Sequence, residues 1–179
     1  MSMTQNFRKI SFVLGGARSG KSIHAETLAK TQHTVAGKLV YLATAQIFDE
    51  EMQTRINLHR QRRGDEWVLV EAPIDLVETL CRFDHQDNVV LVDCLSVWVT
   101  NLIIGGHDVA TARDVLIAHL AKSISSLIFV ASETGLGIVP DNALSRQFRD
   151  ESGRLNQMVA AVSDDVFFVT AGIAQKIKP

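Results

Sequence analysis

The sequence predicts an α/β fold with a mainly parallel central sheet, and two observations lead to this prediction. Short apolar runs recur along the 179 residues, with helical or polar segments between them. Most of these runs show little apolar/polar alternation, as expected of strands that helices cover on both faces. The runs lie at residues 10–14, 39–43, 67–70, 89–92, 127–130 and 166–169.

Composition narrows the class of protein. Lys and Arg number 18 against 20 Asp and Glu, a formal net charge of −2 that gives no sign of a nucleic-acid partner. No stretch approaches the roughly 20 apolar residues of a stable membrane span, and residues 1–9 lack the apolar core of a secretory signal. The sequence therefore predicts a cytoplasmic protein. It contains no linker rich in Pro and Gly, which predicts a single domain over residues 1–179.

The two cysteines, Cys81 and Cys94, stand at a spacing that matches no zinc or redox motif. We expect both to be buried small apolar residues in a reducing compartment. This interpretation gives neither thiol a chemical role.

Two helices can be outlined from their periodicity. In the segment 49–63, one face at helical spacing carries Met52, Arg55, Ile56, His59 and Arg63. The residues Pro140-Asp141-Asn142 offer a helix start, and the apolar positions that follow share one face, which predicts core packing. That second stripe consists of Leu144, Phe148, Leu155, Met158, Val159 and Val162.

The strongest motif is Gly15-Gly16-Ala17-Arg18-Ser19-Gly20-Lys21-Ser22, a full match to G-x-x-x-x-G-K-[ST] between an apolar run and a predicted helix. Its glycines let backbone N–H groups point at phosphate oxygens, and the helix presents its positive dipole end to the same anion. Lys21 can reach the β and γ phosphates, and the Ser22 hydroxyl can bind Mg²⁺. A chance Gly-rich turn is the alternative, and the surrounding strand and helix argue against it. The motif therefore predicts a P-loop NTPase sandwich of the RecA-like kind that holds a nucleoside triphosphate.

Asp93 ends the apolar run at residues 89–92, where a Walker B acid belongs. Burying an Asp without compensation is costly, so a strand-end Asp near a phosphate site usually has a cation partner. The competing interpretation is a helix N-cap before residues 94–102. We favour the metal role, with Ser22 and Asp93 as the Mg²⁺ ligands.

A histidine among arginines suggests a second reaction. His59 stands close to Arg55, Arg60, Arg62 and Arg63. A neutral imidazole can attack phosphorus to give a phosphoramidate, and guanidinium groups would stabilise the charge on the phosphoryl oxygens. A packed helix histidine beside a solvated basic face explains the same residues, and helical spacing alone does not decide between the two.

The combined residues resemble the bifunctional adenosylcobinamide kinase / adenosylcobinamide-phosphate guanylyltransferase family of the cobalamin pathway. The resemblance covers residues 10–178, and a generic P-loop kinase has no reason to carry its motifs in this order. Besides the phosphate loop it rests on Tyr41-Leu42-Ala43-Thr44-Ala45-Gln46, Arg55-Ile56 with His59-Arg60, Trp67 with Glu71-Ala72-Pro73, Val99-Thr100-Asn101-Leu102, Glu133-Thr134-Gly135-Leu136-Gly137-Ile138-Val139-Pro140 and, most specifically, Phe148-Arg149-Asp150-Glu151-Ser152-Gly153-Arg154-Leu155-Asn156-Gln157.

The resemblance implies two reactions. A nucleoside triphosphate, ATP or GTP, phosphorylates the aminopropanol hydroxyl of adenosylcobinamide. GTP then guanylylates His59, pyrophosphate leaves, and GMP passes to adenosylcobinamide phosphate to give adenosylcobinamide-GDP. The family also implies a ring-like homo-oligomer, a trimer, in which a neighbour helps to form the substrate site.

Individual roles follow from the same resemblance. His59 and Lys21 are the expected catalytic residues. Residues 133–140 are expected to shape the substrate side, with a plain turn as the alternative, and an ordinary strand-end acid is the alternative for Glu71. Nucleotide contacts are expected from Gly15, Gly16, Ala17, Arg18, Ser19, Gly20, Lys21, Ser22, Thr44, Ala45, Gln46, Arg60, Gln61, Arg62, Arg63, Glu71 and Asp93.

Two other functions compete with the bifunctional enzyme. A single-activity P-loop kinase of a small alcohol needs no covalent nucleotide on the protein, so His59 argues against it. A GTP-binding regulatory protein that transfers nothing is the other candidate. The pairing of Ser22 with Asp93, with His59 beyond them, argues against mere binding.

Overall fold

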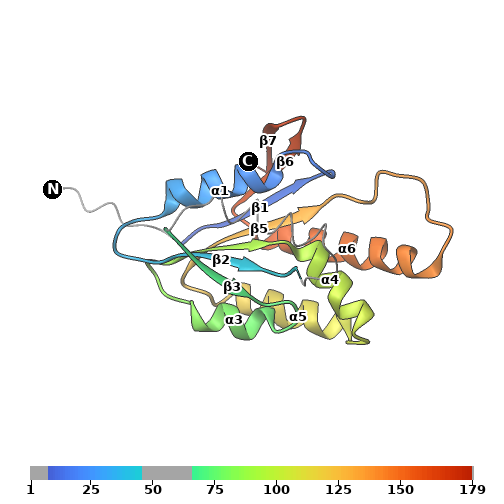
Figure 1. Ribbon diagram of the computed structural model, residues 1–179, viewed down its shortest axis with the longest axis horizontal. Helices are drawn as coiled ribbons and strands as arrows, with labels where there is room; N and C mark the ends of the chain where they lie inside the picture. Colours follow the sequence, from blue (N-terminus) through green and yellow to red (C-terminus); the bar gives the residue numbers. More distant parts are fainter. Residues whose placement is uncertain (1–7, 46–65, 179) are drawn as a thin grey trace.

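The computed structural model describes residues 8–45 and 66–178 (Figure 1). Within them one sheet has the strand order β3-β2-β4-β5-β1-β6-β7, and each neighbouring pair is parallel except β6 with β7. The predicted mainly parallel α/β fold is confirmed. The strands are β1 (Ile10–Gly15), β2 (Leu39–Ala43), β3 (Trp67–Glu71), β4 (Val89–Asp93), β5 (Ser126–Ser132), β6 (Asp165–Thr170) and β7 (Ile173–Lys178).

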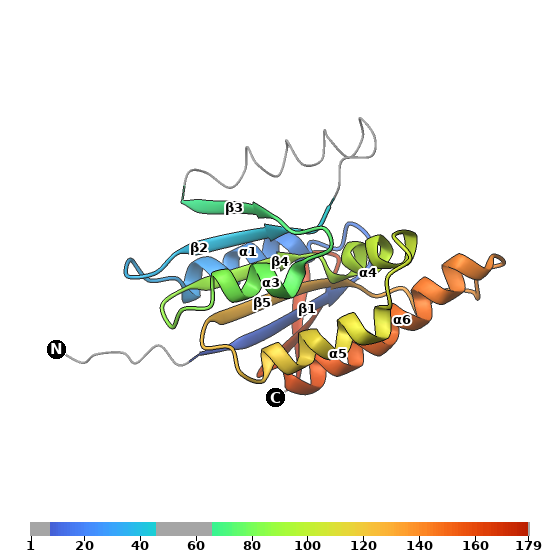
Figure 2. The same ribbon diagram turned by 90° about the horizontal axis from the view of Figure 1, so that it is seen from below.

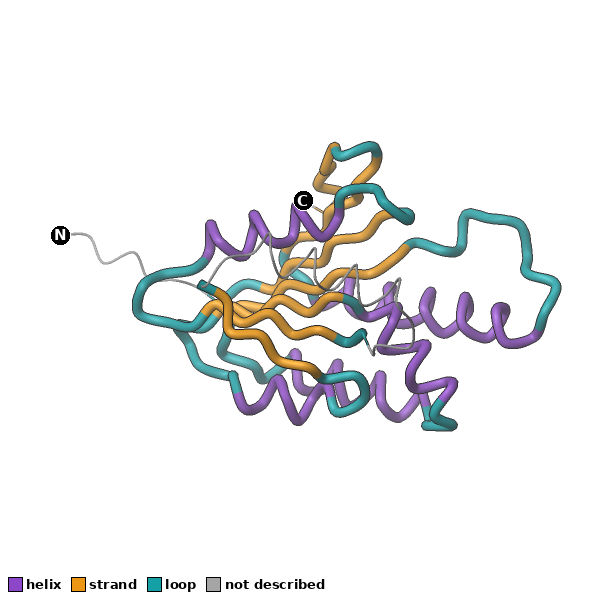
Figure 3. The backbone as a smooth tube through the Cα atoms, viewed as in Figure 1, coloured by secondary structure: helices purple, strands orange, loops and turns teal. Residues whose placement is uncertain are grey.

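The described helices cover the two faces of the sheet unequally (Figures 1 and 3). One face packs against α1 (Lys21–Gln32), through Ala25 and Ala29. The opposite face packs against α3 (Leu76–Arg82), α4 (Leu95–Ile104), α5 (Val109–Leu120) and α6 (Ala143–Val162). Figure 2 shows α5 and α6 side by side along this second face. Each face of the sheet forms its own hydrophobic core with the helices that cover it. Successive residues of a strand point to opposite faces, so whether a residue is odd or even in its strand decides which helices it contacts.

A seventh strand was not expected from the apolar runs. Two residues, Ala171 and Gly172, turn the chain from β6 into β7, and both have positive φ (52° and 80°). A type I′ hairpin turn needs that geometry at both central positions. β7 is mostly exposed and forms one edge of the sheet, which explains why it lacks the apolar run of a covered strand.

The long helix α6 begins where the sequence predicted, after Asn142, whose Oδ1 accepts the N–H of Ser145 at 2.8 Å. Leu155 and Val159 are buried, as the predicted core stripe requires. Leu144 is 54% exposed, so its assignment to the core is wrong. The first turn of α6 extends beyond the end of the sheet (Figure 2), and there Leu144 lines an open pocket with Ile103 and Ile104 of α4.

The expectation that both cysteines are buried is half wrong. Cys81 is exposed, because the inward face of α3 is occupied by Leu76, Thr79 and Leu80. Cys94 is half-buried and packs against the core under α1. Both are free thiols.

The parallel strands begin at one edge of the sheet, here called the amino edge, and end at the carboxyl edge. At the amino edge, Asp84 accepts hydrogen bonds from Ser123 Oγ (2.7 Å), Ile124 N (2.9 Å) and Ser125 N (3.0 Å). Burial alone would raise the pKa of Asp84, but these hydrogen bonds hold it below its usual value. Asn88 likewise bonds Lys38 N and the Phe83 carbonyl.

No helix within the described ranges, 8–45 and 66–178, combines the length and apolar character of a membrane crossing.

Candidate functional site

The phosphate loop connects β1 to α1 at the carboxyl edge and folds back on itself. Lys21 Nζ donates to the Gly16 carbonyl at 3.0 Å, and Ser19 N donates to the same carbonyl at 3.3 Å. Gly20, which precedes α1, has φ 98°, a conformation that glycine adopts without strain. Arg18 also has positive φ (55°). The loop is thus a compact cup, with the cation of Lys21 held at the start of α1.

The turn between β6 and β7 packs against this loop and supports it through a backbone hydrogen bond. Gly172 N donates to the Ser19 carbonyl at 2.8 Å. A Cβ on Gly20 would lie 3.2 Å from Gly172 Cα, and a Cβ on Gly15 would lie only 2.5 Å from the Val169 carbonyl oxygen. These two glycines are therefore needed for close packing of backbone on backbone.

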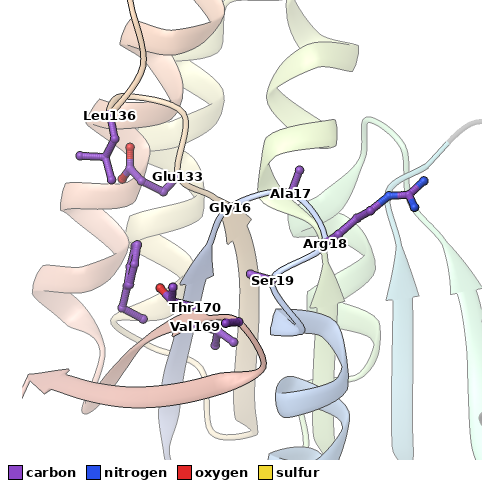
Figure 4. A pocket seen from close by; sticks show the side chains of 10 residues that line it. Gly16, Ala17, Arg18, Ser19, Glu133, Leu136, Val169 and Thr170 are labelled. Atoms are coloured by element: carbon purple, nitrogen blue, oxygen red, sulfur yellow. The ribbon is translucent and has the colours of Figure 1, made fainter.

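A cavity of about 570 Å³ lies beside the loop. Residues 16–19 line one side of it, and Glu133, Leu136, Phe168 and residues 169–171 line the others. Figure 4 shows Glu133 and Leu136 grouped across from the loop, while the Arg18 side chain extends away from them. Ser19 Oγ is buried, with no hydrogen-bond partner among the described residues. A buried hydroxyl without a partner beside a cup of N–H groups suits a phosphate oxygen.

Asp93 ends β4, two strands from β1, and its parity places it on the same side of the sheet as α1. Its Oδ2 accepts the hydroxyl of Tyr41 at 2.7 Å. Tyr41 is buried and meets Trp67 edge-on, with ring centroids 5.7 Å apart. The N-cap of α4 is Cys94, and within the described part of the chain no side chain caps that helix, so the N-cap interpretation of Asp93 is wrong. The carboxylate instead lies on the α1 side of the sheet, bonded to Tyr41.

Thr44 links the ends of β2 and β4. Its hydroxyl accepts Cys94 N at 2.9 Å and donates to the Cys94 carbonyl at 2.8 Å, and the side chain is fully buried. Asn101 Nδ2 donates to the Thr44 carbonyl at 2.8 Å, which adds α4 to the same network. The peptide bond between Asp93 and Cys94 is cis. Sequence reasoning missed these roles of Cys94 and Asn101, because the partners lie about 50 residues apart with no spacing signal.

Two titratable groups near the loop are held neutral. Burial raises the pKa of the Cys94 thiol to about 12, with a further rise from the Asp93 charge, against backbone hydrogen bonds and the Lys21 charge. On this side of the sheet, α1 packs against β4. Burial also lowers the pKa of His24, whose ring meets Phe167 edge-on at 4.9 Å. The Cys94 thiol is therefore no nucleophile at neutral pH, because only the thiolate attacks.

The carboxyl edge brings together many of the residues that the sequence singled out. The loop from Gly15 to Ser22, the pair Thr44 and Ala45, and Asp93 all lie there. Ala43 is in register with both Glu71 and Asp93, so Glu71 ends β3 on the same edge. Outside the described residues lie Gln46, His59, Arg60, Gln61, Arg62 and Arg63.

Hard oxygen donors are present for a magnesium ion. The described ranges hold no cluster of three or more His, Cys, Asp or Glu that could bind a metal by themselves. Mg²⁺ typically takes one or two carboxylates together with phosphate oxygens and waters, so such a cluster is not required. The Ser22 hydroxyl on α1 and the Asp93 carboxylate on the α1 side of β4 fit that donor set.

Comparison with known proteins identifies close sequence relatives. Residues 11–177 match the family described as CobU, cobinamide kinase / cobinamide phosphate guanyltransferase. The chain is 39% identical to the bifunctional adenosylcobalamin biosynthesis protein CobU of Escherichia coli, over 93% of this chain and 98% of that protein. It is 40% identical to CobU of Salmonella typhimurium and to CobP of Pseudomonas aeruginosa, covering 98% and 95% of those proteins and 93% of this chain in each case.

Solved structures share the fold at low sequence identity. The flagellar accessory protein FlaH of Methanocaldococcus jannaschii superposes with a TM-score of 0.53 at 12% identity, covering 95% of this chain and 78% of that one. A solved ATPase domain gives 0.52 at 10% identity, with 90% and 69% covered. These likenesses support the predicted P-loop NTPase fold and carry no information on substrate.

Proposed function

The chain belongs to the cobinamide kinase / cobinamide phosphate guanyltransferase family, and from that premise we propose that it catalyses both reactions. A nucleoside triphosphate phosphorylates the aminopropanol hydroxyl of adenosylcobinamide, and GMP from GTP is then joined to that phosphate to give adenosylcobinamide-GDP. The observation that carries the proposal is similarity over nearly the whole chain to relatives named as bifunctional, with an intact phosphate loop. A single-activity kinase and a GTP-binding regulator are not favoured by these relatives.

The phosphate loop would hold the triphosphate for both reactions. Backbone N–H groups of residues 16–22 and the N-terminus of α1 present partial positive charge to the phosphates. Lys21 would move from the Gly16 carbonyl to the β and γ phosphate oxygens, where it stabilises the charge of the transition state. The Ser19 hydroxyl would donate to a phosphate oxygen.

We assign Ser22 and Asp93 to a magnesium ion. When bound, the ion would neutralise charge on the phosphate oxygens. Asp93 would be held for this role by Tyr41, whose hydroxyl occupies one carboxylate oxygen and leaves the other available. Thr44 and Asn101 support the strand ends on which Asp93 stands.

For the guanylyl transfer we assign His59 as the nucleophile that carries GMP. Arg60, Gln61, Arg62 and Arg63, with Gln46, Ala45 and Glu71, would contact the guanine nucleotide. Thr44 was expected to contact it too, but its side chain is fully buried and bonded to Cys94, so we assign it a positioning role. These assignments rest on the family resemblance of the motif, because His59 and its neighbours lie outside the described residues. We further propose a cytoplasmic homo-oligomer, a trimer, as the working form.

The experiment follows the α-phosphate of GTP. Protein incubated with Mg²⁺ and GTP labelled at that phosphate should retain label after denaturation, through a bond that is acid-labile and alkali-stable, as a phosphoramidate is. His59→Ala should remove the label and keep phosphorylation of cobinamide. GTP binding without covalent label on the wild-type protein would overturn the guanylyl-transfer half and leave a kinase alone.

A further inference from the structure

We propose that the cavity beside the phosphate loop receives the alcohol to be phosphorylated, and that Glu133 is the catalytic residue that accepts its proton. This inference rests on the proposed function and deepens its kinase half. It assigns a subsite to the reactive arm of the acceptor, a hydroxyl on a short aliphatic chain, and leaves the bulk of a large acceptor outside.

Glu133 is fixed next to the phosphate loop by its backbone. It directly follows β5, which pairs with β1, and its N–H donates to the Gly15 carbonyl at 3.1 Å. Its side chain lines the same cavity as residues 16–19. Glu133 is therefore the first acid that a hydroxyl in the cavity would meet on the β5 side of the loop.

The carboxylate of Glu133 is oriented but keeps hydrogen-bonding capacity. One oxygen, Oε1, accepts Gly135 N at 2.6 Å, which fixes the side chain. Within residues 8–45 and 66–178 it has no ion-pair partner. The second oxygen of a carboxylate beside a triphosphate site can accept a proton from a bound hydroxyl. Accepting a proton from an attacking hydroxyl is the use that phosphoryl transfer to an alcohol provides.

The rest of the cavity suits an aliphatic arm that ends in a hydroxyl. Leu136, 83% exposed, and Phe168 supply apolar surface, and Thr170 supplies a polar group (Figure 4). The volume of about 570 Å³ lies within the range of small-ligand sites, about 300–1,000 Å³. Leu136 would bury part of its exposed apolar surface when such an aliphatic arm enters the cavity.

Glu133 lines the cavity and Asp93 does not, which separates the roles of the two acids. Asp93 lies on the α1 side of the sheet, and the lining residue Phe168 belongs to the core on the α6 side. Metal binding and proton removal therefore do not compete for one carboxylate. An acceptor that enters from the α6 side also leaves the β2 and β4 strand ends free for the guanine nucleotide.

Phosphoryl transfer to the alcohol exchanges one P–O bond for another. The acceptor oxygen forms a bond to the γ-phosphorus, and the bond from that phosphorus to the β–γ bridging oxygen breaks, so the nucleoside diphosphate leaves with its electron pair. The hydroxyl proton passes to Glu133, which becomes a neutral carboxylic acid. Glu133 then loses the proton to solvent and is ready for the next turnover.

Glu133→Gln tests the assignment with little change in shape, because the amide oxygen can still accept Gly135 N. We expect kcat for cobinamide phosphorylation to fall about 100- to 10,000-fold, the usual contribution of a general base. The acid limb of the kcat–pH profile should disappear. Covalent labelling of the protein by GTP labelled at the α-phosphate should be unchanged, since that reaction uses no acceptor alcohol. Asp141→Asn, an acid-to-amide change in the same loop but outside the cavity, is the matched control.

The outcomes separate this inference from the proposed function. Unchanged phosphorylation by Glu133→Gln, with labelling intact, would overturn the role of Glu133 and leave the bifunctional enzyme standing. An equal loss of phosphorylation and labelling would also overturn it, because it would assign Glu133 to the shared phosphate site. So would slow phosphorylation that keeps the acid limb. If the wild-type protein showed neither phosphorylation nor covalent labelling, the proposed function itself would be refuted.

Discussion

The turn at residues 84–88 and the phosphate loop lie at opposite edges of the sheet, and they treat polar groups in opposite ways. At the amino edge, Asp84 accepts three hydrogen bonds, and both polar atoms of the Asn88 side chain are bonded. At the carboxyl edge, Ser19 Oγ has no partner among the described residues, and Lys21 donates to a carbonyl of its own loop. Positive φ also occurs in that loop, at Arg18 and Gly20.

The difference separates stability from function. Satisfied polar groups stabilise the native state, and nothing is gained by exchanging their partners for a ligand. Groups with spare capacity, held in place by a rigid sheet, are available to bind phosphate. The turn at residues 84–88 should therefore contribute mainly to stability, and the phosphate loop should contribute mainly to catalysis.

The largest effect is expected from Lys21→Ala. Because the ammonium would lose its contact with the β and γ phosphates, we expect kcat/KM to fall at least about 100-fold in both reactions. The free energy of unfolding should change by less than about 0.5 kcal/mol, since Lys21 is only half-buried. Initial rates and urea unfolding measure the two effects. Lys30→Ala, an exposed lysine in the same helix, is the control, and equal activity in both variants would contradict the division between the edges.

Tyr41→Phe should have the next largest effect. The phenyl ring keeps its contact with Trp67, but Asp93 loses the hydroxyl that orients it. We expect affinity for the metal to fall about 10- to 100-fold, as for other groups that orient metal ligands. Mg²⁺ titration of nucleotide binding measures it, independently of turnover. If metal affinity stays the same while stability alone falls, Tyr41 is part of the core and has no role at the site.

The smallest effect on catalysis is expected from Asp84→Asn. We expect a loss of about 1–3 kcal/mol in the free energy of unfolding at neutral pH, because bonds to the charged acceptor weaken. Both activities should remain. The folded pKa of Asp84 lies below its unfolded value, so its stabilisation is full above the unfolded pKa and is lost as pH falls through the folded pKa. Urea unfolding at several pH values should show the two proteins converging in acid, and Asp87→Asn, in the neighbouring turn, should match wild type.

Much of the fold could be predicted because covered strands leave continuous apolar runs. The runs at residues 10–14 and 89–92 are strands, with Gly15 and Asp93 as their last residues. The edge strand β7 has no such run, since burial is what an apolar run records. The dipeptide Ala171-Gly172 after β6 was the available turn signal.

Less of the site could be predicted, because side-chain partners come from distant strands. The phosphate loop is local, and its motif alone outlines it. The contact of Tyr41 with Asp93 depends on the pairing of β2 with β4, which no spacing reveals. The sequence predicts that residues 133–140 shape the substrate side, but the contact of Glu133 with Gly15 depends on β5 lying beside β1.

The brace between Gly172 and Ser19 has a consequence for the timing of folding. A ribosome makes the phosphate loop early and the β6–β7 turn late. At about 5–20 residues per second, the interval is on the order of 10 s. During that interval the loop lacks the hydrogen bond that holds it from below. The phosphate loop thus gains its last backbone support only after β6 and β7 have joined the sheet.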